Sequence, residues 1–107
     1  MAAARYRDAL GRLSAEVQSE TVLRPPEKAR YRGATAPNYP TVSNNCVIAL
    51  TKRRLVFLTV TGKSTAIPVS EIRGVHEAKV FKVSGGEVAF FVVDNAAWIA
   101  AITSARK

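Results

Sequence analysis

The chain has 107 residues, of which 48% are hydrophobic and 22% charged, a size and composition typical of one compact globular domain. No apolar run approaches the roughly 20 residues that a membrane-spanning helix needs. The first residues lack the apolar stretch of a secretory signal, so we expect a cytoplasmic protein. The formal net charge of +8 favours an anionic partner without naming its class.

An amphipathic helix is predicted at the N-terminus, over residues 2–20. Four apolar residues recur at spacings of four, three and four, on one face of that helix: Tyr6, Leu10, Leu13 and Val17. Because the polar face carries acids as well as bases, we expect the stripe to pack on the rest of the domain rather than on a membrane. We therefore divide the chain into an N-terminal helix, 1–20, and a domain, 21–107, that form one compact unit.

Strands are predicted through the middle of the chain. Pro25-Pro26 is typical of a turn, residues 28–35 indicate a first strand, and 36–45, rich in Pro, Asn and Ser, indicate a loop. The runs "CVIALT" and "RLVFLTV" are joined by the short polar link Lys52-Arg53, which predicts a hairpin.

A turn at Gly62-Lys63 leads to a strand over 64–72, in which Pro68 cannot donate a ladder hydrogen bond and so belongs near an edge or a strand end. Further strands are predicted at 74–83 and 87–93, separated by a glycine turn. Asp94 or Asn95 then caps a C-terminal helix. Its apolar residues are Trp98, Ile99, Ile102 and Ala105.

The segment "VFLTVTGKST" resembles a strand that enters a phosphate-binding loop, but it fails both requirements of that motif. The position five before the Gly-Lys pair is Phe57 instead of glycine, and the residues after Ser64 continue as strand instead of helix. We therefore predict that Gly62-Lys63 forms a turn and binds no nucleotide.

Several motifs together resemble the bacterial PH-like domains of the GRAM type. They are Thr-x-x-Arg-Leu-x-Phe at Thr51–Phe57, then "IPVSEIRGV", "EVAFFV" and "DNAAWIAAI", within a similarity that covers Leu23 to Ala105. The resemblance implies an α+β, mainly β fold: a PH-like antiparallel bent-sheet barrel of six or seven strands with a C-terminal capping helix, here with an extra N-terminal helix. It also implies binding of lipid headgroups, peptides or proteins rather than catalysis.

Alternation along the strands predicts apolar side chains on both faces of the sheet. Leu55 and Phe57 face one way and Val56 and Leu58 the other. The N-terminal helix is the expected cover for the outer face. If it packs elsewhere, that face is a surface for a partner or for self-association. The candidate protein-interface residues are Phe91, Tyr6, Leu10 and Leu13.

No catalytic, cofactor-binding or metal site is predicted. His76 is the only histidine, Cys46 lies in a predicted strand as a small buried hydrophobe, and neither has a partner suited to nucleophilic or metal chemistry. Asp94 has a simpler role as a helix cap. We expect a non-enzymatic chain.

The basic residues suggest where a polyanion could bind. Strand order places four of them at one end of the sheet, as a candidate polyanion-binding cluster: Arg24, Lys28, Lys52 and Arg53. Arg54 either joins them or makes a structural ion pair. At the opposite end the loop over residues 33–45 carries no charge, which argues against the phosphoinositide pocket common in PH domains.

These observations favour a protein-interaction or scaffolding module, with self-association as one form. The first alternative is peripheral binding to anionic membrane lipid through the Lys52-Arg53 end. The second is nucleic acid, for which the hint is Tyr31 between Arg30 and Arg32. Strand alternation sends the tyrosine to the face opposite both arginines, which weakens that hint.

Overall fold

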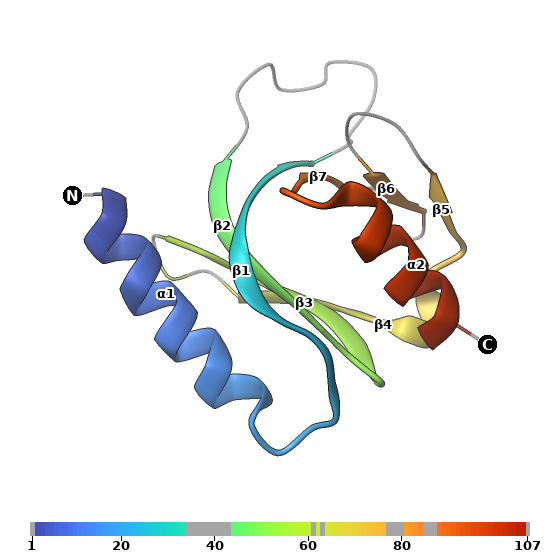
Figure 1. Ribbon diagram of the computed structural model, residues 1–107, viewed down its shortest axis with the longest axis horizontal. Coiled ribbons are helices and arrows are strands. Elements are labelled where there is room, and N and C mark those ends of the chain that lie inside the picture. Colours follow the sequence, from blue (N-terminus) through green and yellow to red (C-terminus); the bar gives the residue numbers. More distant parts are fainter. Residues whose placement is uncertain are drawn as a thin grey trace.

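A computed structural model describes the chain over residues 2–33, 44–60, 62, 64–76, 81–84 and 88–106. Figure 1 shows a curled sheet with one helix outside it and one inside the curl. The elements in chain order are α1 Ala2–Val17, β1 Val22–Gly33, β2 Asn44–Thr51, β3 Arg54–Thr59, β4 Ser64–Pro68, the 3-10 helix η1 Val69–Glu71, β5 Gly74–His76, β6 Phe81–Ser84, β7 Val88–Phe91 and α2 Asn95–Ala105.

The seven strands form one antiparallel sheet in the order β4-β3-β2-β1-β7-β6-β5. β1 joins the two halves, because it pairs with β2 along its length and with β7 through Arg30–Gly33. The prediction of one strand over 74–83 was wrong, since β5 and β6 are separate strands. Both are short, which is how three late strands fit between η1 and α2.

The first strand begins earlier than predicted, at Val22, and contains Pro25-Pro26 instead of following it. Proline has no N–H to donate. The pairing of β1 with β2 accordingly shifts register between Val22 and Arg24 and again between Arg24 and Glu27. The sheet therefore absorbs the two prolines as a bulged segment, and the prediction of a turn was wrong.

The β2–β3 hairpin and the turn at Gly62 are confirmed. Gly62 has φ 106°, in the left-handed region, and its N–H donates to the Thr59 carbonyl at 2.9 Å. Pro68 ends β4, an outer strand of the sheet, and η1 begins at the next residue, so the strand predicted to reach residue 72 stops four residues earlier. Asp94 is the helix cap, because its carboxylate accepts from the Ala97 N–H at 3.0 Å.

The main core lies inside the curl, under α2. Leu55, Phe57 and Phe90 are buried there with Trp98 and Ile102 of α2. The Phe57 ring packs edge-on against Phe90, with 5.1 Å between ring centroids. The prediction that Leu55 and Phe57 share one face of the sheet is confirmed.

A second apolar cluster lies on the outer face, between the sheet and α1. Val47, Val56 and Leu58 are buried against Leu13 and Val17 of the helix. This confirms both the predicted alternation in β3 and the expectation that the N-terminal helix covers the outer face. The helix is three residues shorter than predicted, since it ends at Val17.

Candidate anion-binding surface

The β2–β3 turn, which carries Lys52 and Arg53, is held by hydrogen bonds on three sides. The Thr51 hydroxyl accepts from the N–H groups of Arg53 and Arg54, each at 3.1 Å. The Lys52 N–H donates to the Thr21 carbonyl at 3.0 Å, and the Arg53 carbonyl accepts from the Val69 N–H at 2.8 Å. These bonds fix the backbone, so the two basic side chains project from a rigid support.

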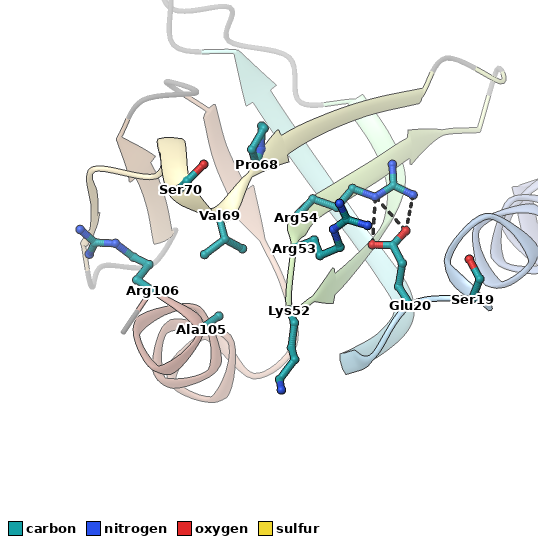
Figure 2. Close-up of a pocket in the computed structure, with 10 residues that line it drawn as sticks. All are labelled: Ser19, Glu20, Lys52, Arg53, Arg54, Pro68, Val69, Ser70, Ala105 and Arg106. Atoms are coloured by element: carbon teal, nitrogen blue, oxygen red, sulfur yellow. Dashed lines mark hydrogen bonds and ion pairs between the residues drawn. The ribbon is translucent and has the colours of Figure 1, made fainter.

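The turn borders an open hollow of about 800 Å³ (Figure 2). Its lining comes from the end of α1, the turn itself, η1 and the end of α2, and includes Arg53, Arg54, Val69, Ala105 and Arg106. We call this the basic hollow. Segments roughly 50 residues apart in the sequence therefore form one concave surface.

Three basic side chains at the basic hollow form no ion pair among the described residues, although Glu20 lies near enough to Arg53 for the arginine's charge to help lower the Glu20 pKa. They are Lys52, Arg53 and Arg106, and all three are exposed. The Arg106 guanidinium donates to the Arg73 carbonyl at 2.8 Å, a bond that positions the group and leaves its charge. The basic hollow therefore favours an anionic group.

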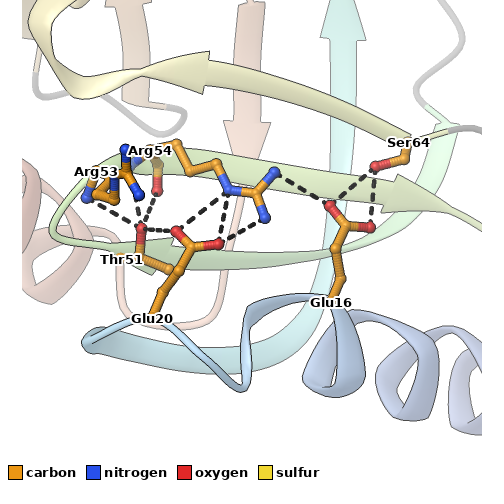
Figure 3. Close-up of polar contacts among 6 residues, drawn as sticks. All are labelled: Glu16, Glu20, Thr51, Arg53, Arg54 and Ser64. Atoms are coloured by element: carbon orange, nitrogen blue, oxygen red, sulfur yellow. Dashed lines mark hydrogen bonds and ion pairs between the residues drawn. The ribbon is translucent and has the colours of Figure 1, made fainter.

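Arg54 also lines the basic hollow, but it forms ion pairs with two acids at the end of α1 (Figure 3). Its guanidinium lies 2.7 Å from the Glu20 carboxylate and 3.3 Å from that of Glu16. Hydrogen bonds from Arg54 lower the pKa of Glu20, although partial burial of the carboxylate acts in the opposite direction. The same contact with Glu20 raises the pKa of Arg54. The structural ion pair named as one alternative for Arg54 is the one present, and it ties α1 to β3.

Arg24, from the predicted basic cluster, is in register with Leu50 and is not among the residues that line the basic hollow. Its guanidinium is 3.0 Å from the Glu27 carboxylate and 5.2 Å from the centre of the Trp98 ring. The Trp98 ring N–H also donates to Glu27, at 2.7 Å. Arg24 thus belongs to a contact between β1 and α2.

Lys28 lies on the outer face of β1, in register with Val47, with its ammonium group 5.1 Å from the centre of the Tyr6 ring. Burial raises the pKa of the Tyr6 hydroxyl, and the nearby charge of Arg30 opposes that rise. Of the four predicted residues, Lys52 and Arg53 line the basic hollow. As polyanion ligands all four stay a prediction.

The candidate protein-interface residues occupy three environments. Leu13 of α1 is fully buried against the sheet, and Leu10 of the same helix is half-buried beside it. Tyr6 and Phe91 are half-buried at the outer face, where Phe91 pairs in register with exposed Arg30. Binding of a partner by these residues stays a prediction.

A second hollow, of about 650 Å³, lies between α1 and the end of β3, where Thr59 and Val60 line it. Its charged lining residues are Arg7, Asp8 and Arg12, so bases and an acid lie within one helical stretch. The mixed charge gives no preference for an anion.

The described residues hold no arrangement that suggests catalysis. Cys46 is buried, and burial raises the pKa of its thiol to about 12. The part of the chain with described placement contains no group of three or more potential metal ligands. His76 ends β5, and its side chain lies outside the described residues, as do the side chains of Arg32 and Lys63. Among the described helices, none is long and apolar enough to cross a membrane.

Sequence reasoning missed Arg106 as a member of the basic surface. The sequence showed that Arg106 lies at the end of a predicted helix. The residues around it do not indicate that this helix end lies near the Lys52-Arg53 turn, more than 50 residues earlier in the chain. The weak signal available was the basic pair Arg106-Lys107, after the last apolar residue of the helix.

Comparison with known proteins identifies the fold. No family model matches the chain, and no curated protein matches it. The solution structure of the N-terminal PH domain of human ARAP2 is similar, with a TM-score of 0.62 over 79% of this chain and 80% of that one, at 16% sequence identity. The strand order, the curled sheet and the C-terminal helix agree with this likeness, and the chain has a PH-like fold.

Proposed function

We propose that this chain is a non-catalytic, cytoplasmic interaction module that binds an acidic protein partner at the basic hollow. The resemblance of the Thr51–Phe57 motif to GRAM-type domains supports a binding role. The PH-like fold is compatible with it, although a fold alone names no ligand.

One observation carries this proposal: three cations that form no ion pair within the described part of the chain border a concave surface with an apolar floor. Lys52, Arg53 and Arg106 supply the charge, while Val69 and Ala105 supply the floor. Protein interfaces combine an apolar centre with a polar rim, and complementary charge speeds association and selects the partner. An acidic protein surface with an apolar side chain matches both features.

A second candidate, peripheral binding to anionic membrane, is favoured by two exposed apolar residues. Val22 and Leu23 are 39% and 37% exposed at the start of β1. Val22 is in register with Thr51, directly before the Lys52-Arg53 turn. Apolar side chains beside bases are what a membrane interface attracts, at roughly 1 kcal/mol for each base near the surface.

The test compares three probes with one pair of variants. The wild-type chain is titrated with a glutamate-rich peptide, with phosphatidylserine vesicles and with a random DNA duplex, at low and physiological salt. We expect the peptide to bind at both salt concentrations. We expect the double change Lys52→Glu and Arg53→Glu to weaken that binding by at least about tenfold, or about 1.4 kcal/mol.

Arg7→Glu with Arg12→Glu is the matched control, because it reverses the same charge on exposed residues of α1 that line the second hollow instead of the basic hollow. A control variant that loses peptide binding equally would show that net charge, rather than the basic hollow, is responsible. Strong binding of vesicles with none of the peptide would replace the protein proposal by the membrane one. Binding of the duplex alone would replace it by nucleic acid.

A further inference from the structure

We infer that the basic hollow takes an extended acidic segment of the partner, with carboxylates at both ends and an apolar side chain between them, rather than one compact anionic group. This inference rests on the proposed function and adds the form of the ligand.

The directions of two of the cations, Lys52 and Arg106, carry the first step. Lys52 and Arg53 come from the β2–β3 turn, and Arg106 comes from the end of α2. In Figure 2 the side chains of Lys52 and Arg106 point away from each other, to different sides of the basic hollow. A single phosphate or carboxylate cannot contact both ends. A chain that crosses the surface can present a separate carboxylate to each.

The floor between those ends carries the second step. Val69 retains 8% exposure and belongs to the main core, and Ala105 is half-buried at the end of α2. Pro68 is exposed beside them. Burying apolar surface stabilises a complex by roughly 25 cal/mol per Å². An apolar side chain in the middle of the segment therefore fits this floor better than a further charge.

The rigidity of both ends carries the third step. The turn is fixed by Thr51, Thr21 and Val69. At the other end the Arg106 N–H closes α2 on the Ile102 carbonyl, and its guanidinium holds the Arg73 carbonyl. A ligand does not have to order either support, which lowers the cost of binding.

Glu20 limits the site to those three cations. Its carboxylate lies at the edge of the basic hollow and holds Arg54. An incoming acid therefore meets Arg54 already neutralised. Releasing it would require breaking the bonds that tie α1 to β3, so the segment should contact the two ends instead.

The experiment uses labelled synthetic peptides of identical composition, measured by fluorescence anisotropy against the full chain. In one peptide two glutamates flank an alanine-leucine-alanine spacer; in the other the two glutamates are adjacent. We expect the spaced peptide to bind at least threefold tighter, a difference of roughly 0.65 kcal/mol. Inositol hexakisphosphate serves as the compact anionic probe, and we expect it to bind more weakly than the spaced peptide.

Charge reversal at each end supplies the sharper test. Lys52→Glu should lower the affinity for the spaced peptide. A peptide with lysine in place of one terminal glutamate should restore the affinity of this variant. Arg106→Glu should lower the affinity in the same way, and the peptide with lysine at the other terminus should restore it. Both variants change exposed residues, and an unchanged thermal midpoint verifies that each is folded.

Equal affinity of the spaced and adjacent peptides, or rescue of both variants by the same lysine peptide, would overturn the inference. So would tighter binding of inositol hexakisphosphate. In each of these cases an anion still binds at the basic hollow, so only the form of the ligand is refuted. Absence of binding by every acidic probe would instead refute the proposed function itself.

Discussion

Replacement of Leu13 by alanine tests whether α1 is an integral cover of the sheet. Leu13 is fully buried against Val47, Val56 and Leu58. The change removes three buried carbon atoms, worth about 0.8 kcal/mol each, and leaves a cavity. Because α1 lies at the surface and can shift to close part of that cavity, we expect a loss of about 3 kcal/mol, within the range for buried leucines.

Urea unfolding followed by two probes measures this loss. Far-ultraviolet circular dichroism reports the helices, and the fluorescence of Trp98 reports the main core on the other side of the sheet. If α1 unfolds together with the domain, the two transitions coincide and both move to lower urea. By heat, the midpoint should fall by about 12 °C.

Ser14→Ala is the matched control, because Ser14 is exposed on the same helix, and its effect should stay within about 0.5 kcal/mol. A loss below about 0.5 kcal/mol for Leu13→Ala would refute the reasoning. The helix would then dock weakly in solution, and its apolar stripe would become available to a partner.

Three further predictions follow from single contacts. A double-mutant cycle with Arg54→Met and Glu20→Gln should give a coupling energy of roughly 1 kcal/mol at neutral pH. The pKa of Glu20 is lower in the folded chain than its ordinary 4.5. This coupling energy is therefore present above pH 4.5 and is lost as the pH falls through the pKa of the folded chain. A coupling energy that stays unchanged at low pH would contradict the ion pair. Gly11→Ala should raise the free energy of unfolding by about 0.5 to 1 kcal/mol, because the added Cβ meets nothing within 4 Å and alanine favours the helix; a destabilised variant in the same urea assay would contradict this. Cys46, with a thiol pKa of about 12, should resist iodoacetamide at pH 8 in the folded chain and react in urea, as followed by mass spectrometry; rapid reaction in the native state would show that the thiol is accessible.

The faces of the sheet could be predicted because alternation is a local property of a strand. Residues 55–58 divide between the inner and outer clusters as their order indicates, and the stripe of α1 covers the outer one. The cap at Asp94 was equally predictable, since its partner lies three residues away. In each case the determining contact is close in sequence or follows from a fixed period.

The bounds of β1 could not be predicted, because pairing with β2 overrides the local turn preference of Pro25-Pro26. The division between β5 and β6 was hidden for a related reason. A continuous apolar run does not show where strand pairing stops.

The binding surface was only half predictable, because the sequence shows charges but not their partners. Arg24 and Arg54 are as basic as Lys52, yet Glu27 and Glu20 hold them. Recognition of Arg106 required the packing of α2 beside η1, a contact between distant segments.

The most direct test of the account is an amide-resolved NMR titration of the full chain with the spaced acidic peptide, at low and physiological salt. The account predicts shifts at Lys52, Arg53 and Arg106 that saturate together. Shifts centred on Tyr6 and Phe91 at the outer face, with the basic hollow unchanged, would contradict it and place the interaction surface beside α1.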